Sequence, residues 1–99
     1  MIERKRPPST PGQILVKHHL EPNGISIERF ARAAGLSRKH VSQIAHGRAA
    51  LSPETAIKFG AVLNTSAELW LNLQKAVDLH AAHEKLRDWQ PNEELHTAA

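Results

Sequence analysis

The stretch "SIERFARAAGLSRKHVSQIAHGR", residues 26–48, contains two short helical patterns joined at a glycine. Ser26 has the type of side chain that caps a helix N-terminus, and Gly35 ends the first pattern because glycine adopts a left-handed conformation at little cost. Ser37 caps the second pattern, which ends at Gly47. The stretch therefore predicts two short helices separated by a tight turn, which is the arrangement of a helix-turn-helix.

The spacing of small and apolar residues supports this prediction. Ala31 lets the two helices approach each other, and Val41 and Ile44 lie three residues apart, on one side of the second helix. We therefore expect the second helix to pack inward through Val41 and Ile44 and to leave its other residues facing outward.

Helix signals continue through the rest of the chain. Residues 10–13, "TPGQ", combine a cap hydroxyl, a proline at the first helical position and a glutamine three residues after the cap, and "EPNG" at 21–24 ends that helix. A second capping box, at residues 65–68, opens a last helix that we expect to reach Asp88. No segment alternates like a strand between hairpin turns. We expect an all-α fold of five helices, at about residues 10–20, 26–35, 37–47, 52–64 and 65–88.

Length and composition restrict the classes of function. A chain of 99 residues forms one domain and is too short for a deep catalytic cavity beside its core. It has no cysteine, which suits a reducing compartment. The N-terminus, "MIERKRPPSTPG", lacks the apolar run of a signal peptide, and no apolar run is long enough to cross a bilayer. We expect a cytoplasmic protein.

The charge is divided between the two halves of the chain. Residues 1–51 hold nine Lys and Arg against three Glu, a net charge of +6, whereas residues 52–99 hold four against seven acidic residues, a net charge of −3. A basic half attracts a polyanion such as nucleic acid, and an acidic half suits a basic protein.

The outward side of the helix after Ser37 carries the candidate DNA-reading residues. In a major groove, arginine and lysine read guanine O6 and N7, and glutamine reads adenine N6 and N7. An ordinary solvated face is the alternative reading. At about 100° per residue, the residues expected to reach base edges are Arg38, Lys39, Ser42 and Gln43.

Other residues are placed to meet the DNA backbone. Phosphate contacts need donors around the rim of the interface, and the candidates are Ser37, His40, His46, Arg48 and Arg29. Arg29 and its neighbour Arg32 are equally candidates for surface ion pairs. The basic arm at residues 1–9 is either a flexible tail or an arm that enters a minor groove.

Seven histidines raise the question of a metal site or an enzyme. His80 and His83 are three residues apart with Glu84 beside them, but a structural metal site needs four ligands and a catalytic site three. The same histidines with Glu84 are candidates for acid–base cleavage of RNA, but the sequence has no phosphate-binding loop and no nucleophile signature. We expect no cofactor, no metal, no small-molecule substrate and no enzymatic activity.

Residues 26–48 resemble the helix-turn-helix of lambdoid phage repressors and the wider XRE family. "TPGQIL" at 10–15, "EPNGIS" at 21–26, "ALSPETAIKFGAVLNTSAELWLNLQKAVDL" at 50–79 and above all its "WLNLQ" at 70–74 resemble the HigA/VapI-type antitoxins. The resemblance covers about residues 10–80. One departure is Ile27, because phage repressors often carry a backbone-contacting glutamine there.

This resemblance implies a lambda-repressor-like domain that binds double-stranded operator DNA as a homodimer and represses its own operon. It also implies a protein partner, a HigB-type ribonuclease toxin that cleaves messenger RNA on the ribosome and that the antitoxin neutralises. The alternatives are a stand-alone repressor of the XRE type without a toxin, and a toxin-binding module that no longer binds DNA.

The last helix has two faces in the sequence pattern. Trp70 and Leu69 fall near Leu73 on the side expected to form core, whereas Leu71 falls on the side expected to face water. We take Leu71, with Leu86 and Trp89 further along, as candidates for a dimer or toxin interface; a frayed acidic tail is the alternative for the end. The predicted organisation is a flexible arm at 1–9, a helix-turn-helix domain at 10–80 and a C-terminal extension at 81–99.

Overall fold

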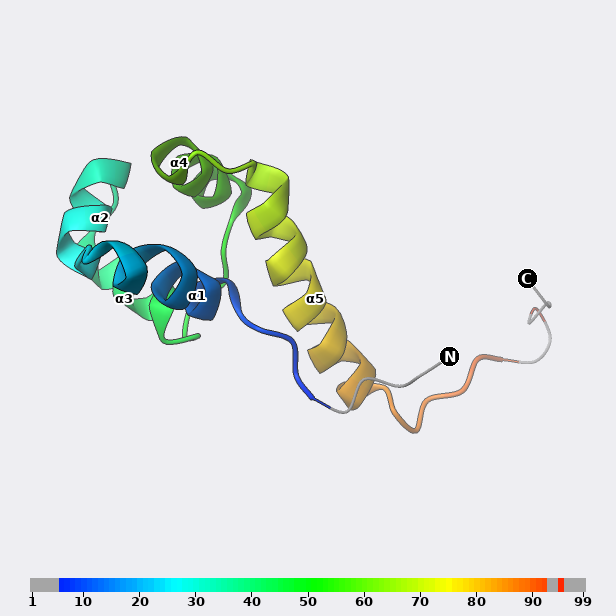
Figure 1. The fold of residues 1–99 in the computed structure, drawn as a ribbon. Coiled ribbons are helices and arrows are strands. Elements are labelled where there is room, and N and C mark those ends of the chain that lie inside the picture. The colour runs from blue at the N-terminus through cyan, green and yellow to red at the C-terminus, as the bar shows by residue number, and fades with distance from the viewer. Residues whose placement is uncertain (1–5, 93–94, 96–99) are drawn as a thin grey trace.

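A computed structural model describes residues 6–92 and 95, and within this part of the chain every regular element is a helix. The five-helix, all-α prediction is confirmed (Figure 1). The α-helices are α1 (Pro11–Ile14), α2 (Ile27–Ala34), α3 (Arg38–Ala45), α4 (Pro53–Leu63) and α5 (Ala67–Lys85). A π-helix, η1 (Leu15–Leu20), and a 3-10 turn, η2 (Glu21–Asn23), continue α1.

The first helix begins as the sequence predicts and then widens. Thr10 and Gln13 form the predicted capping box: the Gln13 N–H donates to Thr10 Oγ1 at 3.1 Å, and the Thr10 N–H donates to Gln13 Oε1 at 3.0 Å. The π-helical segment then carries both Leu15 and Leu20 into the core, where each is at most 2% exposed. A regular α-helix was expected here, and cap signals do not predict such a widening.

The turn between α2 and α3 follows the predicted chemistry. Ser26 Oγ accepts the Arg29 N–H at 3.0 Å, and Ser37 Oγ accepts the His40 N–H at 3.0 Å, so both serines cap their helices. Gly35 has φ +66°, and the Leu36 N–H donates to the Ala31 carbonyl at 2.9 Å. These bonds close the C-terminus of α2 and direct the chain into α3.

Three aromatic rings join α2, α4 and α5 in the core. Phe59 packs edge-to-face against Phe30, with ring centroids 5.1 Å apart, and against Trp70 at 5.3 Å. The His19 ring lies 5.4 Å from Trp70. Trp70 is fully buried, and its Nε1–H donates to Thr65 Oγ1 at 2.8 Å. Trp70 is therefore a core residue, as its position in the sequence pattern predicts.

The start and end of α5 differ from the prediction. Ser66, not Thr65, caps the helix by accepting the Leu69 N–H at 3.1 Å, because the Thr65 hydroxyl is held by Trp70. The predicted capping box at 65–68 is therefore wrong in register by one residue. The helix ends at Lys85, short of Asp88, and its last turns project beyond α1–α4 in Figure 1.

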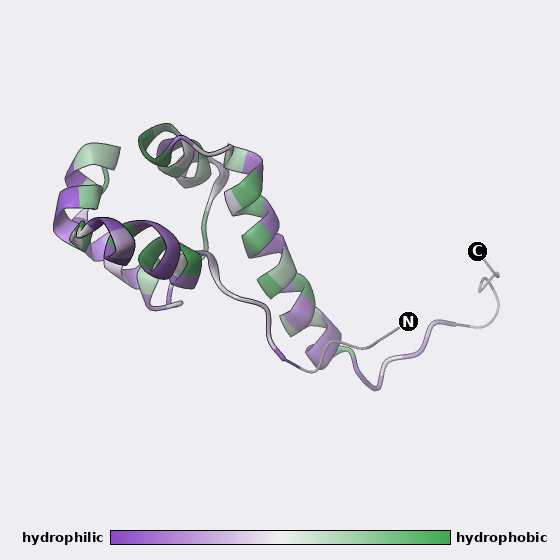
Figure 2. Ribbon diagram, in the orientation of Figure 1, coloured by the Kyte–Doolittle hydropathy of each residue, from purple (hydrophilic) through white to green (hydrophobic). Residues whose placement is uncertain are grey.

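The faces of α5 also differ from the prediction. Leu69 is 40% exposed, although it was expected in the core. Leu71 was expected to face water, yet it is partly buried and packs against the core. The reason is the α3–α4 connection, which places Leu51 beside Leu71 and covers a side of the helix that periodicity leaves open. Figure 2 shows hydrophobic and hydrophilic residues interleaved along α5.

Candidate nucleic-acid interface

Helix α3 is fixed by contacts on two sides: its inner face packs on the core, and α1 lies against its C-terminal half. Val41 and Ile44 are at most 2% exposed, which confirms the predicted inward positions. On the other side α1 approaches so closely that a Cβ built on Gly12 would lie 2.0 Å from the Ile44 carbonyl oxygen and 2.7 Å from the Ala45 Cα. Only glycine fits at residue 12, and the contact fixes the C-terminal half of α3 against α1.

The sequence did not single out Gly12 for this role. The sequence does place a glycine in the first turn of a predicted helix. Glycine is a poor helix former, and a helix needs no left-handed conformation at that position. Such a residue indicates a close approach of two backbones.

The predicted base-reading residues lie on the open side of α3. Arg38 and Lys39 are exposed in its first turn, and Ser42 and Gln43 are partly buried one turn later. They come from a single rigid helix, so their mutual spacing is fixed before any DNA binds. The arrangement offers two cationic donors near the N-terminus of α3, followed by a hydroxyl and an amide.

Ser37 and Arg48, two of the predicted phosphate-binding residues, lie at opposite ends of α3. At the N-terminus Ser37 Oγ is used as a cap, and the helix dipole there favours an anion. At the C-terminus Gly47 takes φ +71°, and the Arg48 N–H donates to the Gln43 carbonyl at 2.7 Å. This turn leaves the Arg48 side chain exposed just beyond the helix.

The two remaining arginines of the helix-turn-helix are distinguished by their partners. Arg32 pairs with Glu28 at 3.6 Å in an i,i+4 arrangement, with both side chains more than 60% exposed. Such surface pairs contribute little to stability. Arg29 is exposed and has no ion-pair partner within the described part of the chain. Arg32 therefore has a surface ion-pair partner and Arg29 has none among the described residues, while both guanidinium groups are exposed.

The two candidate histidine sites on α3 differ in exposure. His40 is partly buried, whereas His46 is exposed and caps the C-terminus of the helix. His46 Nδ1 lies 2.7 Å from the Ser42 carbonyl oxygen, so the ring is bonded back to its own helix.

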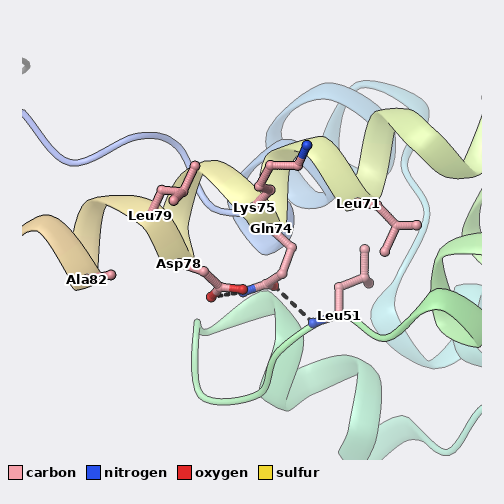
Figure 3. Close-up of a pocket in the computed structure, with 7 residues that line it drawn as sticks. All are labelled: Leu51, Leu71, Gln74, Lys75, Asp78, Leu79 and Ala82. Carbon is pink, nitrogen blue, oxygen red and sulfur yellow. Dashed lines mark hydrogen bonds between the residues drawn. The ribbon is translucent and has the colours of Figure 1, made fainter. Parts of the chain in front are cut away.

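A second link that the sequence did not reveal joins the end of the helix-turn-helix to α5. The Leu51 N–H donates to Gln74 Oε1 at 2.9 Å, and Gln74 Nε2 donates to Asp78 Oδ1 at 2.9 Å. Figure 3 shows both bonds: the first crosses from the α3–α4 connection to α5, and the second joins two residues of α5. The sequence feature that could have indicated this link is the polar Gln74 at the end of the partly buried "WLNLQ" segment.

Beside this link lies an open groove of about 450 Å³, which we call the α5 groove (Figure 3). Its walls are mainly apolar, and it is lined by Leu51, Leu71, Gln74, Lys75, Asp78, Leu79 and Ala82. Leu79 is 51% exposed, and Leu86 and Trp89, further along the chain, are 53% and 62% exposed. Of the predicted interface residues, Leu71 therefore lines the groove, whereas Leu86 and Trp89 lie beyond the last residue of α5.

The structure brings together no metal-binding cluster in the part of the chain that it describes. No three His, Cys, Asp or Glu side chains among residues 6–92 and 95 are grouped so that they would hold an ion, and the region of His80 and His83 is included in that range. None of the helices in the same residues is long and apolar enough to span a membrane.

Known proteins share this sequence and this fold. Residues 16–70 match the family described as "Helix-turn-helix". Antitoxin HigA-1 of Vibrio cholerae is 42% identical over 79 residues, which are 80% of this chain and 74% of that protein. The Escherichia coli K12 protein named uncharacterized HTH-type transcriptional regulator YbaQ is 33% identical over all of this chain and 88% of its own.

Among solved structures, antitoxin GraA in complex with its operator superposes with a TM-score of 0.83 at 30% identity and covers 100% of both chains. The match includes α3 and both of its flanking helices, as well as the full length of α5. On these grounds the chain belongs to the helix-turn-helix family of lambda-repressor-like, XRE-type proteins and, within that family, to the HigA-type antitoxins.

Proposed function

We propose that this protein is the antitoxin of a type II toxin–antitoxin module, which binds operator DNA through α3, represses its own operon and neutralises a HigB-type ribonuclease toxin. The observation that carries the proposal is the polar, cationic side of α3 on a helix-turn-helix whose full-length relative, antitoxin GraA, is known bound to its operator. The relative named HigA-1 supports the antitoxin role.

The DNA contacts proposed for α3 divide into two groups. Base contacts come from the open side of the helix, from Arg38, Lys39, Ser42 and Gln43. Phosphate contacts come from its two ends and from α2, through Ser37, His40, Arg48 and Arg29. The base contacts choose the operator sequence, whereas the phosphate contacts set affinity and its dependence on salt.

The homodimer proposed here forms along the outer part of α5. Leu71 lies in the wall of the α5 groove, and the exposed Leu86 and Trp89 follow the last residue of α5, so exposed apolar side chains continue beyond the end of the helix. A two-fold interface is self-complementary, so Leu86 and Trp89 of one protomer are proposed to pack against the α5 groove of the other. The toxin is proposed to bind the acidic C-terminal half.

Several further assignments are part of the proposal. The protein acts in the cytoplasm, is not an enzyme, and needs neither cofactor, metal nor small-molecule substrate. Its parts are a basic arm at residues 1–9, of which residues 1–5 lie outside the described part of the chain, a helix-turn-helix domain at 10–80, and a C-terminal extension at 81–99, of which residues 93, 94 and 96–99 lie outside it. The match to a helix-turn-helix family and to a protein named as a transcriptional regulator supports a DNA-binding role in place of an enzymatic one.

The experiment that tests this function expresses the open reading frame next to the gene, alone and together with this protein, and records growth. Growth arrest that the protein relieves supports the antitoxin role. A stand-alone repressor is the second candidate, and the similarity to the regulator YbaQ over the whole chain favours it. Specific binding to the protein's own upstream DNA, with no arrest by the neighbouring frame, would select that candidate.

A further inference from the structure

His46 makes two hydrogen bonds to one carbonyl group at the end of α3. Its backbone N–H donates to the Ser42 carbonyl oxygen at 3.0 Å, and its ring Nδ1 lies 2.7 Å from the same oxygen. The Ser42 hydroxyl is a weaker neighbour, 3.4 Å from Nδ1. A carbonyl oxygen has two lone pairs, and both are used here.

These bonds determine which ring nitrogen of His46 carries the hydrogen. A carbonyl oxygen only accepts, so Nδ1 must be the donor at 2.7 Å. In a neutral imidazole one nitrogen is a donor and the other an acceptor, and the partner of one sets the state of the other. The neutral ring of His46 therefore presents Nε2 as a bare acceptor.

An acceptor nitrogen on this exposed ring can be paired with the hydrogen-bond donors of a major groove. Among the candidate base-reading residues of α3, Arg38 and Lys39 in the first turn are donors only, which suits guanine, and Gln43 both donates and accepts. In the major groove the hydrogen-bond donors are the amino groups at adenine N6 and cytosine N4. Phosphate oxygens only accept, so the neutral ring in this tautomer has no N–H to offer the backbone.

We propose that His46 is a specificity-determining residue, whose Nε2 accepts a hydrogen bond from the amino group of an adenine or cytosine. This inference rests on the proposed operator binding and gives His46 a different role from the phosphate contact expected from the sequence. The phosphate contact would require a ring protonated on both nitrogens.

The first test concerns the tautomer and needs no DNA. Long-range ¹H–¹⁵N correlation spectra of the full chain at pH 8 report which ring nitrogen of each histidine is protonated. We expect the proton of His46 on Nδ1. His40 is the internal comparison, because its ring has no hydrogen bond among the described residues. A His46 ring protonated on Nε2 would overturn the inference and leave the proposed function untouched.

The second test uses a duplex selected from a random pool by the wild-type protein at pH 8. Each adenine is replaced in turn by purine, which lacks the N6 amino group, and each cytosine by 2-pyrimidinone, which lacks the N4 amino group. We expect the replacement at the base that His46 contacts to weaken wild-type binding about ten- to a hundredfold, within the range of one good base contact, in addition to any loss at an adenine that Gln43 reads.

The variants identify the contact. His46→Ala should bind the natural duplex more weakly by the same factor and should be indifferent to that one replacement, whereas His18→Ala, an exposed histidine outside α3 and α5, should behave as wild type. Equal weakening of every duplex by His46→Ala, with a smaller salt dependence, would mean a phosphate contact and overturn the inference. If the wild type selected no sequence, the proposed function would fail as well.

Discussion

Replacing Gly12 by alanine should separate α1 from α3. The new Cβ would lie 2.0 Å from the Ile44 carbonyl oxygen, whereas ordinary contact begins at 3.4 Å, so the two backbones must move apart by about 1 Å or more. A gap of that size removes about a quarter to a half of the dispersion attraction at each contact between the two helices. Overpacking of this kind costs about 1–3 kcal/mol, and the better helix propensity of alanine returns only about 0.5–1 kcal/mol.

We therefore expect Gly12→Ala to lower the free energy of unfolding by about 1–2 kcal/mol, measured by urea denaturation. Because α1 fixes the C-terminal half of α3, the folded variant should also bind the selected operator duplex more weakly. Gly24→Ala is the matched control: Gly24 has φ +63° and no atom near a built Cβ, so this change strains the backbone but leaves α3 in place.

Both variants should lose stability, and only Gly12→Ala should lose affinity once the folded fraction is corrected for. A Gly12→Ala protein with wild-type stability and wild-type affinity would refute the reasoning. It would mean that α1 can move aside without cost and does not position α3.

Four further changes test the core, the proposed DNA contacts and the proposed dimer. Thr65→Val should lower the free energy of unfolding by about 1–3 kcal/mol, because it leaves the buried Trp70 Nε1–H without its acceptor; urea denaturation measures this, and Thr65→Ser should stay close to wild type. Gln43→Ala should weaken operator binding by about 1–3 kcal/mol at one base position, and an equal loss on random DNA in a fluorescence titration would contradict base reading. Arg48→Ala should weaken all duplexes alike and reduce the salt dependence by about one phosphate, seen in titrations at several salt concentrations. Leu86→Glu should shift the protein to monomers by light scattering, and an unchanged dimer would remove Leu86 from the interface.

Local signals predicted most of the fold. A helix cap depends on residues within three positions of each other, which is why Ser26, Ser37 and the Thr10–Gln13 box could be identified from the sequence. Periodicity predicted the inward positions Val41 and Ile44 for the same reason, since a helix repeats over a few residues.

The errors arise where distant segments meet. The exposure of Leu69 and the partial burial of Leu71 depend on the path of the α3–α4 connection across α5, which helical periodicity does not contain. Thr65 and Ser66 both carry a hydroxyl at the start of α5. The buried Trp70 Nε1–H uses the Thr65 hydroxyl as its acceptor, so Ser66 forms the helix cap.

The side of α3 that carries the candidate site could be predicted from the sequence, but the individual atomic contacts around it could not. The outward side of α3 follows from its buried side, so Arg38, Lys39 and Gln43 could be placed there from the sequence. The close approach at Gly12 and the hydrogen bond that selects the His46 tautomer depend on atomic distances, which the spacing of residues does not provide.

The bond between Leu51 and Gln74 has a consequence for operator geometry. Leu51 follows α3 closely in the chain, and Gln74 lies on the helix proposed to form the dimer, so one amide side chain joins the connection after α3 to that helix. Paired reading helices must match successive major grooves about 34–36 Å apart. In the proposed dimer, Gln74 would therefore help to set the distance between the two α3 helices, and a partner bound in the α5 groove would change that distance without touching DNA.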